Sequence, residues 1–173
     1  MILRSAFTVL LLLSPISAAS QSSSQPLSQA TAAVPQQRFV CNTGYTAAEC
    51  SAQMAVLRPV LDRYGANRLG EWTWVLVRSG DWKRMKERLG LDPDSPAFSY
   101  LPARETFFEE ALVVPVPGRS AELMRHWESS MADLLVLAVT HELGHGLCGE
   151  RDEHKADANG RLVRSGAEVT CRR

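Results

Sequence analysis

A run of five residues, His141 to His145 (HELGH), combines residue types that can bind a metal ion and move a proton. Two histidines at positions i and i+4 lie on one face of a helix, so both imidazoles can reach one zinc ion at about 2.0–2.1 Å. Glu142 directly follows the first histidine and can approach a metal-bound water as a general base. The chain contains 4 histidines in all, which makes this spacing uncommon by chance.

A catalytic zinc site requires a third protein ligand and leaves a fourth position open. The residues after the motif do not fit the metzincin pattern, which has glycine three residues and histidine six residues after the second histidine. Cys148 and Arg151 occupy those two positions here. The third ligand must therefore be sought elsewhere in the segment that follows.

That segment contains Glu153-His154-Lys155-Ala156-Asp157. It resembles the second ligand helix of the gluzincins, the thermolysin-like and CAAX-protease-like zinc peptidases, in which E-x-x-x-D or E-x-x-A-D follows HExxH. The resemblance covers about residues 139–160. It implies that Glu153 is the third zinc ligand. It also implies that Asp157, one turn later, accepts a hydrogen bond from the outer nitrogen of His141 and orients that ligand.

The spacing between the two halves of this pattern departs from the thermolysin-like enzymes. Only seven residues separate His145 from Glu153, so a tight turn must join the two helices, which the glycines of this segment permit. The identity of the third ligand depends on that turn. His154 is the main alternative, and Asp152 and Asp157 are weaker ones.

The resemblance implies a zinc-dependent hydrolase of peptide or protein substrates, in which Glu142 passes a proton from the water to the leaving amine. Two alternatives belong to other classes. One is a zinc-binding protein without turnover, in which His154 or Cys148 closes the site as a fourth ligand. The other is a disulfide-bonded interaction module in which HELGH occurs by chance. Candidates for stabilising an oxyanion, none with further support from the sequence, are His126, Tyr100 and Arg161.

Length and composition indicate one globular domain. The chain has 173 residues, of which 45% are hydrophobic, within the usual range for a folded protein. Its 19 acidic and 19 basic residues cancel, and a nucleic-acid-binding domain normally carries a basic excess. No apolar run reaches the ~18 residues that a membrane span requires. We expect neither nucleic-acid binding nor a stable membrane span.

The N-terminus is predicted to direct export. Arg4 precedes a short apolar stretch, residues 6–13, and Ser17-Ala18-Ala19 offers small residues for cleavage. We therefore predict a signal peptide over residues 1–19 and a periplasmic or secreted protein. Residues 20–37 carry no charge and are rich in Ser, Gln, Ala and Pro, which is typical of a disordered linker. Residues 38–173 then form the folded domain.

Four cysteines in an exported chain favour two disulfides, with three possible pairings. They are Cys41, Cys50, Cys148 and Cys171. We expect Cys41–Cys50 to tie the incoming chain to the start of a helix. We expect Cys148–Cys171 to join the turn after the metal-binding helix to the C-terminal tail, which would exclude Cys148 as a zinc ligand.

The elements before the metal-binding helix are predicted from hydrophobic spacing and capping residues. Thr46 and Glu49 form a capping box for a helix that ends at Gly65, with a kink or break near Arg58 caused by Pro59. Strands are predicted over 72–77, 97–101 and 105–114, and a short helix capped by Asp81 and ended by Gly90 follows the first strand.

The metal-binding helix is predicted to start at Ser130, with Asp133 completing the cap. Residues 134–139 are apolar on all sides, so this helix should be buried, and Gly146 and Gly149 should end it. A last helix is predicted over about 152–163. The expected fold is α+β, a small zincin-like domain with a buried HExxH helix, a short second ligand helix and a small sheet. By the resemblance, an edge strand of this sheet, 97–101 or 105–114, binds extended substrate.

Overall fold

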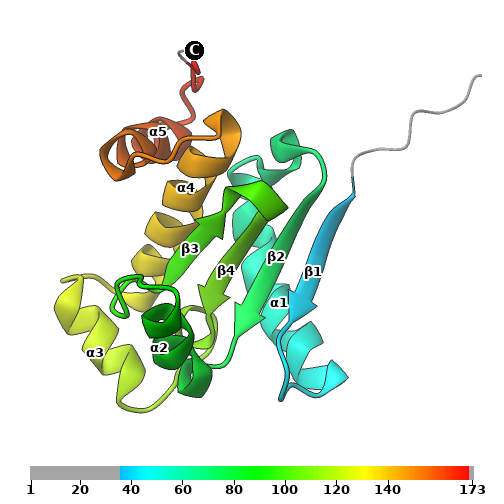
Figure 1. The fold of residues 1–173 in the computed structure, drawn as a ribbon, viewed down its shortest axis with the longest axis vertical. Coiled ribbons are helices and arrows are strands. Elements are labelled where there is room, and N and C mark those ends of the chain that lie inside the picture. Colours follow the sequence, from blue (N-terminus) through cyan, green and yellow to red (C-terminus); the bar gives the residue numbers. More distant parts are fainter. Residues whose placement is uncertain (1–35, 172–173) are drawn as a thin grey trace, which may run out of the picture. The chain divides into compact units, whose positions relative to one another are not determined.

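The computed structural model describes residues 36–171 and shows an α+β fold (Figure 1). The predicted signal peptide and nearly all of the predicted linker lie outside the described residues. The strands are β1 (Gln37–Cys41), β2 (Trp72–Val77), β3 (Ala97–Tyr100) and β4 (Glu105–Glu109). The α-helices are α1 (Ala47–Arg63), α2 (Ser79–Arg88), α3 (Arg119–His126), α4 (Met131–Cys148) and α5 (Glu153–Ser165). Short 3₁₀ helices are η1 (Ala66–Leu69), η2 (Leu101–Ala103) and η3 (Glu110–Leu112).

The four strands form one mixed sheet in the order β1-β2-β4-β3. The pairs β1–β2 and β2–β4 are parallel, and β3 runs antiparallel to β4. The sequence did not predict β1, which begins at Gln37 inside the predicted linker and pairs with β2. The strand predicted over 105–114 is shorter, because the chain turns into η3 after Glu109. This turn brings Glu109 to Arg119 and Glu110 to Arg78.

Alternate residues of the strands pack on opposite faces of the sheet. Trp72, Trp74 and Leu76 of β2 join the main core with residues of α1 and α4. Val75 and Val77 point to the other face, where Trp82 of α2 covers them. Figure 1 shows α2 in front of the strands and α1 behind them. The sheet is therefore buried on both sides, which explains the nearly continuous apolar run of β2.

Helix α1 has the predicted capping box, since the Thr46 and Glu49 side chains each bond the backbone of the other. The predicted break at Pro59 does not occur, and α1 continues to Arg63. Pro59 lies on the exposed side of the helix. The carbonyl that its missing N–H leaves free is therefore on the side that water can reach, which lowers the cost of the proline.

Helix α4 begins as predicted, with the Ser130 side chain accepting a bond from Asp133 N. It ends at Cys148, and Gly149 follows in the left-handed conformation. The prediction that Gly146 ends the helix is wrong. A Cβ atom at Gly146 would lie 3.0 Å from a side-chain carbon of Leu69, so this glycine makes room for a neighbouring element.

Two helices differ from the predictions. Helix α3 was not predicted. Helix α2 begins at Ser79, so that Asp81 lies inside its first turn and is not its cap. Both disulfides join the expected partners, Cys41 with Cys50 and Cys148 with Cys171. Across residues 36–171, no helix is long and apolar enough to cross a membrane.

Candidate metal centre

Three side-chain atoms from α4 and α5 converge at one point. His141 Nε2 lies 3.0 Å from His145 Nε2 and 3.0 Å from Glu153 Oε2. His145 Nε2 lies 3.3 Å from the same Glu153 oxygen. These are the two histidines of the HELGH motif and the glutamate that the resemblance implied as third ligand.

The outer nitrogens of both imidazoles face hydrogen-bond acceptors. His141 Nδ1 lies 2.7 Å from Asp157 Oδ1, and His145 Nδ1 lies 2.8 Å from the backbone carbonyl oxygen of Glu150. A carbonyl or an ionised carboxylate only accepts hydrogen bonds, so each Nδ1 carries a proton. In a neutral imidazole the other nitrogen is then unprotonated. When both imidazoles are neutral, the two Nε2 atoms and the Glu153 oxygen therefore direct three lone pairs at one point.

This arrangement fits a zinc ion. Lone pairs this close repel each other unless a positive charge lies between them. Ligand atoms at ~2.0–2.2 Å from a tetrahedral zinc lie about 3.3–3.6 Å from one another, and the three separations here, 3.0, 3.0 and 3.3 Å, lie at or slightly below that range. Two imidazoles and one carboxylate also form a donor set that zinc accepts in hydrolytic sites.

The local charge favours a cation as well. Burial lowers the pKa of His141, but the negative charges of Glu142, Asp157 and Glu153 outweigh burial and leave this pKa above its usual value. The histidine pair therefore lies in a negative potential. That potential can be neutralised by a proton or by a metal ion, and the convergence of three donors favours the metal.

Glu142 occupies a different environment from Glu153. Its side chain points from α4 toward the sheet and is only 3% exposed, and its Oε2 atom has no hydrogen-bond partner. Burial raises the pKa of this carboxyl group, although His141, His145 and Ser99 act in the opposite direction. A buried carboxylate oxygen without a partner is costly, which suggests that it has a functional role.

The turn between the two ligand helices is organised by Glu150, which the sequence analysis did not single out. Its backbone carbonyl holds His145, and its carboxylate Oε1 accepts bonds from the backbone N–H groups of Arg151 at 2.9 Å and Asp152 at 3.0 Å. Asp152 in turn caps α5 by accepting a bond from Lys155 N. This compact turn is how the short spacing between His145 and Glu153 is accommodated.

Close contact between α4 and α5 depends on two glycines. A Cβ atom at Gly144 would lie 2.2 Å from the carbonyl oxygen of Ala156, and one at Gly160 would lie 2.9 Å from that of Thr140. Asn159 Nδ2 donates to the Gly144 carbonyl oxygen across the same interface. The small residues let the two backbones approach until Glu153 and Asp157 reach His141.

The other candidate residues lie outside this group. His154 is exposed and Asp152 caps α5, so neither belongs to the cluster of converging donors. Cys148 is bonded to Cys171 and offers no thiolate. The residues considered for an oxyanion lie at the end of β3 (Tyr100), at the end of α3 (His126) and on the exposed side of α5 (Arg161).

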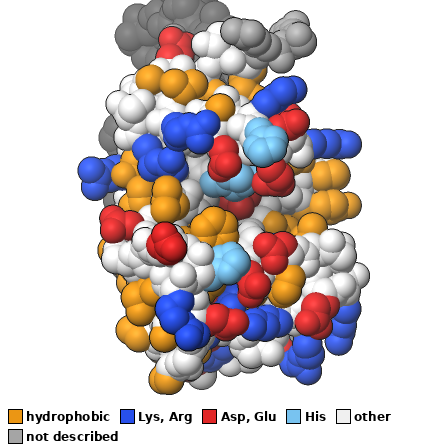
Figure 2. Space-filling model, turned by 90° about the vertical axis from the view of Figure 1, so that its left-hand side faces the viewer, with side chains coloured by type: hydrophobic (Ala, Val, Ile, Leu, Met, Phe, Trp, Pro, Cys, Tyr) orange, Lys and Arg blue, Asp and Glu red, His pale blue; other side chains and the backbone are white. Residues whose placement is uncertain are grey.

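The metal-binding face is open to solvent. The side chain of Glu153 is 74% exposed and that of Asp157 is 55% exposed, whereas His145 is 9% exposed. Figure 2 shows histidine side chains with acidic side chains beside them on one face of the molecule. The three converging side chains can therefore be reached from solvent.

Comparison with protein-family models, with curated proteins and with solved structures finds no match for this chain. The resemblance to the gluzincins thus depends on residues 139–160 alone. Any proposal about function must depend on the geometry of the site itself.

Proposed function

We propose that this protein is an exported zinc metallopeptidase of the gluzincin type. In this proposal His141, His145 and Glu153 bind the ion, and Glu142 is the general base. The observation that carries it is the convergence of three potential ligand atoms, with both outer imidazole nitrogens at hydrogen-bond distance from acceptors.

The chain's own residues divide the chemistry between them. A bound zinc ion in such a site polarises the scissile carbonyl group and lowers the pKa of water. The Glu142 carboxylate, buried beside the ligands, takes the proton of the attacking water and passes it to the nitrogen of the leaving amine. In this proposal the Asp157 carboxylate and the Glu150 carbonyl accept the Nδ1 protons of His141 and His145, which favours the tautomer with Nε2 free.

The number of ligands supports a catalytic site over a structural one. Structural zinc sites normally have four protein ligands, and catalytic sites have three. Among the described residues, three donors gather, and the two residues considered as a fourth ligand, Cys148 and His154, are not among them. The fourth position is then available to water or substrate.

The edge strand β3 supports a peptide as substrate. The sequence left two strands as candidates for the edge of the sheet, and they correspond to β3 and β4. Strand β4 lies between β2 and β3, so β3 is the edge strand. An extended peptide can pair with the free backbone groups of such a strand. Helix α4 packs against β3, which would bring a peptide bound there close to Glu142.

The direct test is Glu142→Gln in the zinc-loaded protein, assayed on a mixture of unstructured peptides. We expect the variant to keep zinc and fold but to lose at least about 10²-fold in rate, the usual contribution of a general base. Glu168→Gln, a change at an exposed glutamate near the C-terminus, serves as the matched control and should retain full activity. Hydrolysis by Glu142→Gln at the wild-type rate would contradict the proposed role.

A further inference from the structure

Three polar side chains form a hydrogen-bonded row on the face of the sheet that packs against α4. Trp72 Nε1 donates to Thr106 Oγ1 at 3.0 Å, and Thr106 Oγ1 lies 2.8 Å from Ser99 Oγ. Ser99 and Thr106 are direct partners in the β3–β4 register, and Thr106 is fully buried. A hydroxyl group in an apolar core is costly unless it is bonded, so valine would be the simpler residue at position 106.

The row lies on the face of the sheet against which α4 buries Glu142. On α4, Glu142 lies three residues after Val139 and seven after Leu135, and all three are buried on the side of the helix that packs on the core. Helix α4 contacts β3, and Ser99 shares a strand face with Ala97, which belongs to the same core.

When Ser99 gives its proton to an ionised Glu142, the hydrogen bonds along this row have one possible direction. An indole N–H only donates, and a carboxylate only accepts. Thr106 therefore accepts from Trp72 and gives its own proton to Ser99, which leaves the Ser99 proton for Glu142. Each bond polarises the next along such a chain.

We propose that Ser99, supported by Thr106 and Trp72, is a positioning residue that orients the Glu142 carboxylate toward the attacking water. This inference depends on the proposed peptidase function for its kinetic consequence. The hydrogen-bonded row itself is independent of that function. The two can therefore be tested separately.

The row is tested in metal-free, ¹⁵N-labelled protein by the indole N–H signals of the four tryptophans. All four indoles donate a hydrogen bond, and those of Trp74, Trp82 and Trp127 bond Gln37, Ser95 and Asp94, so they serve as internal references. We expect Glu142→Gln to shift the Trp72 signal in the wild type and to leave it unmoved in a Ser99→Ala background. An equal shift in both backgrounds, or none in either, overturns the connection.

The positioning role is tested kinetically in the zinc-loaded enzyme. We expect Ser99→Ala to lower kcat about tenfold, as expected for loss of one hydrogen bond to a charged group, with KM changed less than about twofold. Ser99→Thr should restore most of kcat, and Thr73→Val, which removes a hydroxyl from β2 on the opposite face of the sheet, should have no effect. Unchanged kcat in Ser99→Ala contradicts the positioning role alone, whereas an inactive wild type contradicts the peptidase function.

Discussion

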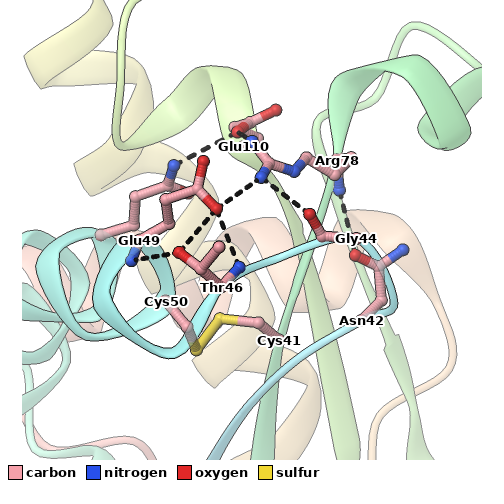
Figure 3. Close-up of a disulfide and its surroundings, with 9 residues drawn as sticks. Cys41, Asn42, Gly44, Thr46, Glu49, Cys50, Arg78 and Glu110 are labelled. Carbon is pink, nitrogen blue, oxygen red and sulfur yellow. Dashed lines mark hydrogen bonds and ion pairs between the residues drawn. A yellow bond between two sulfur atoms is a disulfide. The ribbon is translucent and has the colours of Figure 1, made fainter.

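The protein contains two corners that are each braced by a disulfide, and they differ in how their carboxylates are neutralised. At the first corner, beside Cys41–Cys50, Arg78 lies 3.0 Å from Glu49 and 2.8 Å from Glu110 (Figure 3). Glu110 also accepts a bond from the backbone of Ser79. We call Arg78, Glu49 and Glu110 the Arg78 cluster. Here each acid has a cationic partner within the chain.

The second corner, beside Cys148–Cys171, contains Glu142, Glu153 and Asp157. Glu153 and Asp157 lie within ion-pair distance of histidines, and within residues 36–171 no arginine or lysine pairs with any of the three. The acids of the Arg78 cluster are therefore paired with an arginine, whereas the ion pairs of the second corner involve histidines alone. An acidic group whose charge the fold does not balance is a better indicator of a site than the number of charges it contains.

The largest expected effect is the loss of zinc affinity when Glu153, the proposed third ligand, is removed. We expect Glu153→Ala to weaken zinc binding more than about 100-fold, beyond the 10–100-fold expected when a residue that only orients a ligand is changed, as in Asp157→Asn. His154→Ala, at the adjacent exposed position, is the control and should leave affinity unchanged. Competition with a chromophoric chelator measures all three, and zinc loss in His154→Ala alone would reverse the ligand assignment.

The next effect concerns the contact between the ligand helices. Gly144→Ala places a Cβ atom 2.2 Å from the Ala156 carbonyl oxygen, so α5 must move away from α4. We expect a loss of about 1–3 kcal/mol in unfolding free energy together with weaker zinc binding. Gly80→Ala meets no atom within 4 Å and should be neutral or stabilising by up to about 1 kcal/mol. Urea titration compares the two, and equal stability would refute the close contact.

The two disulfides should have similar effects on stability and different effects on the metal. Cys148 and Cys171 are 23 positions apart in the sequence, and Cys41 and Cys50 are 9 positions apart. The chain-entropy model assigns each disulfide about 3 kcal/mol. Removing Cys148–Cys171 with paired alanines should also weaken zinc binding, because it frees the end of α4. Removing Cys41–Cys50 should leave zinc affinity unchanged. Equal loss of zinc affinity in both variants would show that the corners are not independent.

The smallest effect is the acid dependence of the Arg78 cluster. Bonds from the Thr46 backbone and from Arg78 lower the pKa of Glu49 from 4.5 to about 2. Because the folded pKa is below the unfolded one, the stabilisation is complete above pH 4.5 and is lost as the pH falls toward 2. Glu49→Gln should therefore show a shallower decrease in melting temperature between pH 5 and 2 than wild type or Glu168→Gln. An unchanged slope would contradict this assignment.

The residues of the candidate metal centre could be singled out because they are local in sequence. His141, His145, Glu153 and Asp157 lie on two consecutive helices, and helical spacing alone places each pair on one face. The capping residues Thr46 and Ser130 were equally readable, because a cap involves only neighbours.

The features that were missed depend on distant partners. Strand β1 follows an uncharged low-complexity segment and is recognisable only through its pairing with β2. Gly146 was predicted to end α4, but it lies inside the helix, where a Cβ atom would crowd the Leu69 side chain. No local sequence pattern reveals this contact. The Ser99–Thr106 pair requires the register of β3 and β4. Sequence patterns thus singled out three residues whose side chains the structure brings together, whereas the surroundings of these residues required the three-dimensional structure.

The central claim is that one metal ion binds among His141 Nε2, His145 Nε2 and Glu153 Oε2, with no sulfur ligand. X-ray absorption at the zinc edge, on protein loaded with one equivalent of zinc and then dialysed, tests it most directly. The expected result is stoichiometric zinc with two imidazole nitrogens and oxygen ligands at about 2.0–2.2 Å. Loss of all zinc on dialysis, or a sulfur ligand at about 2.3 Å, would contradict the account.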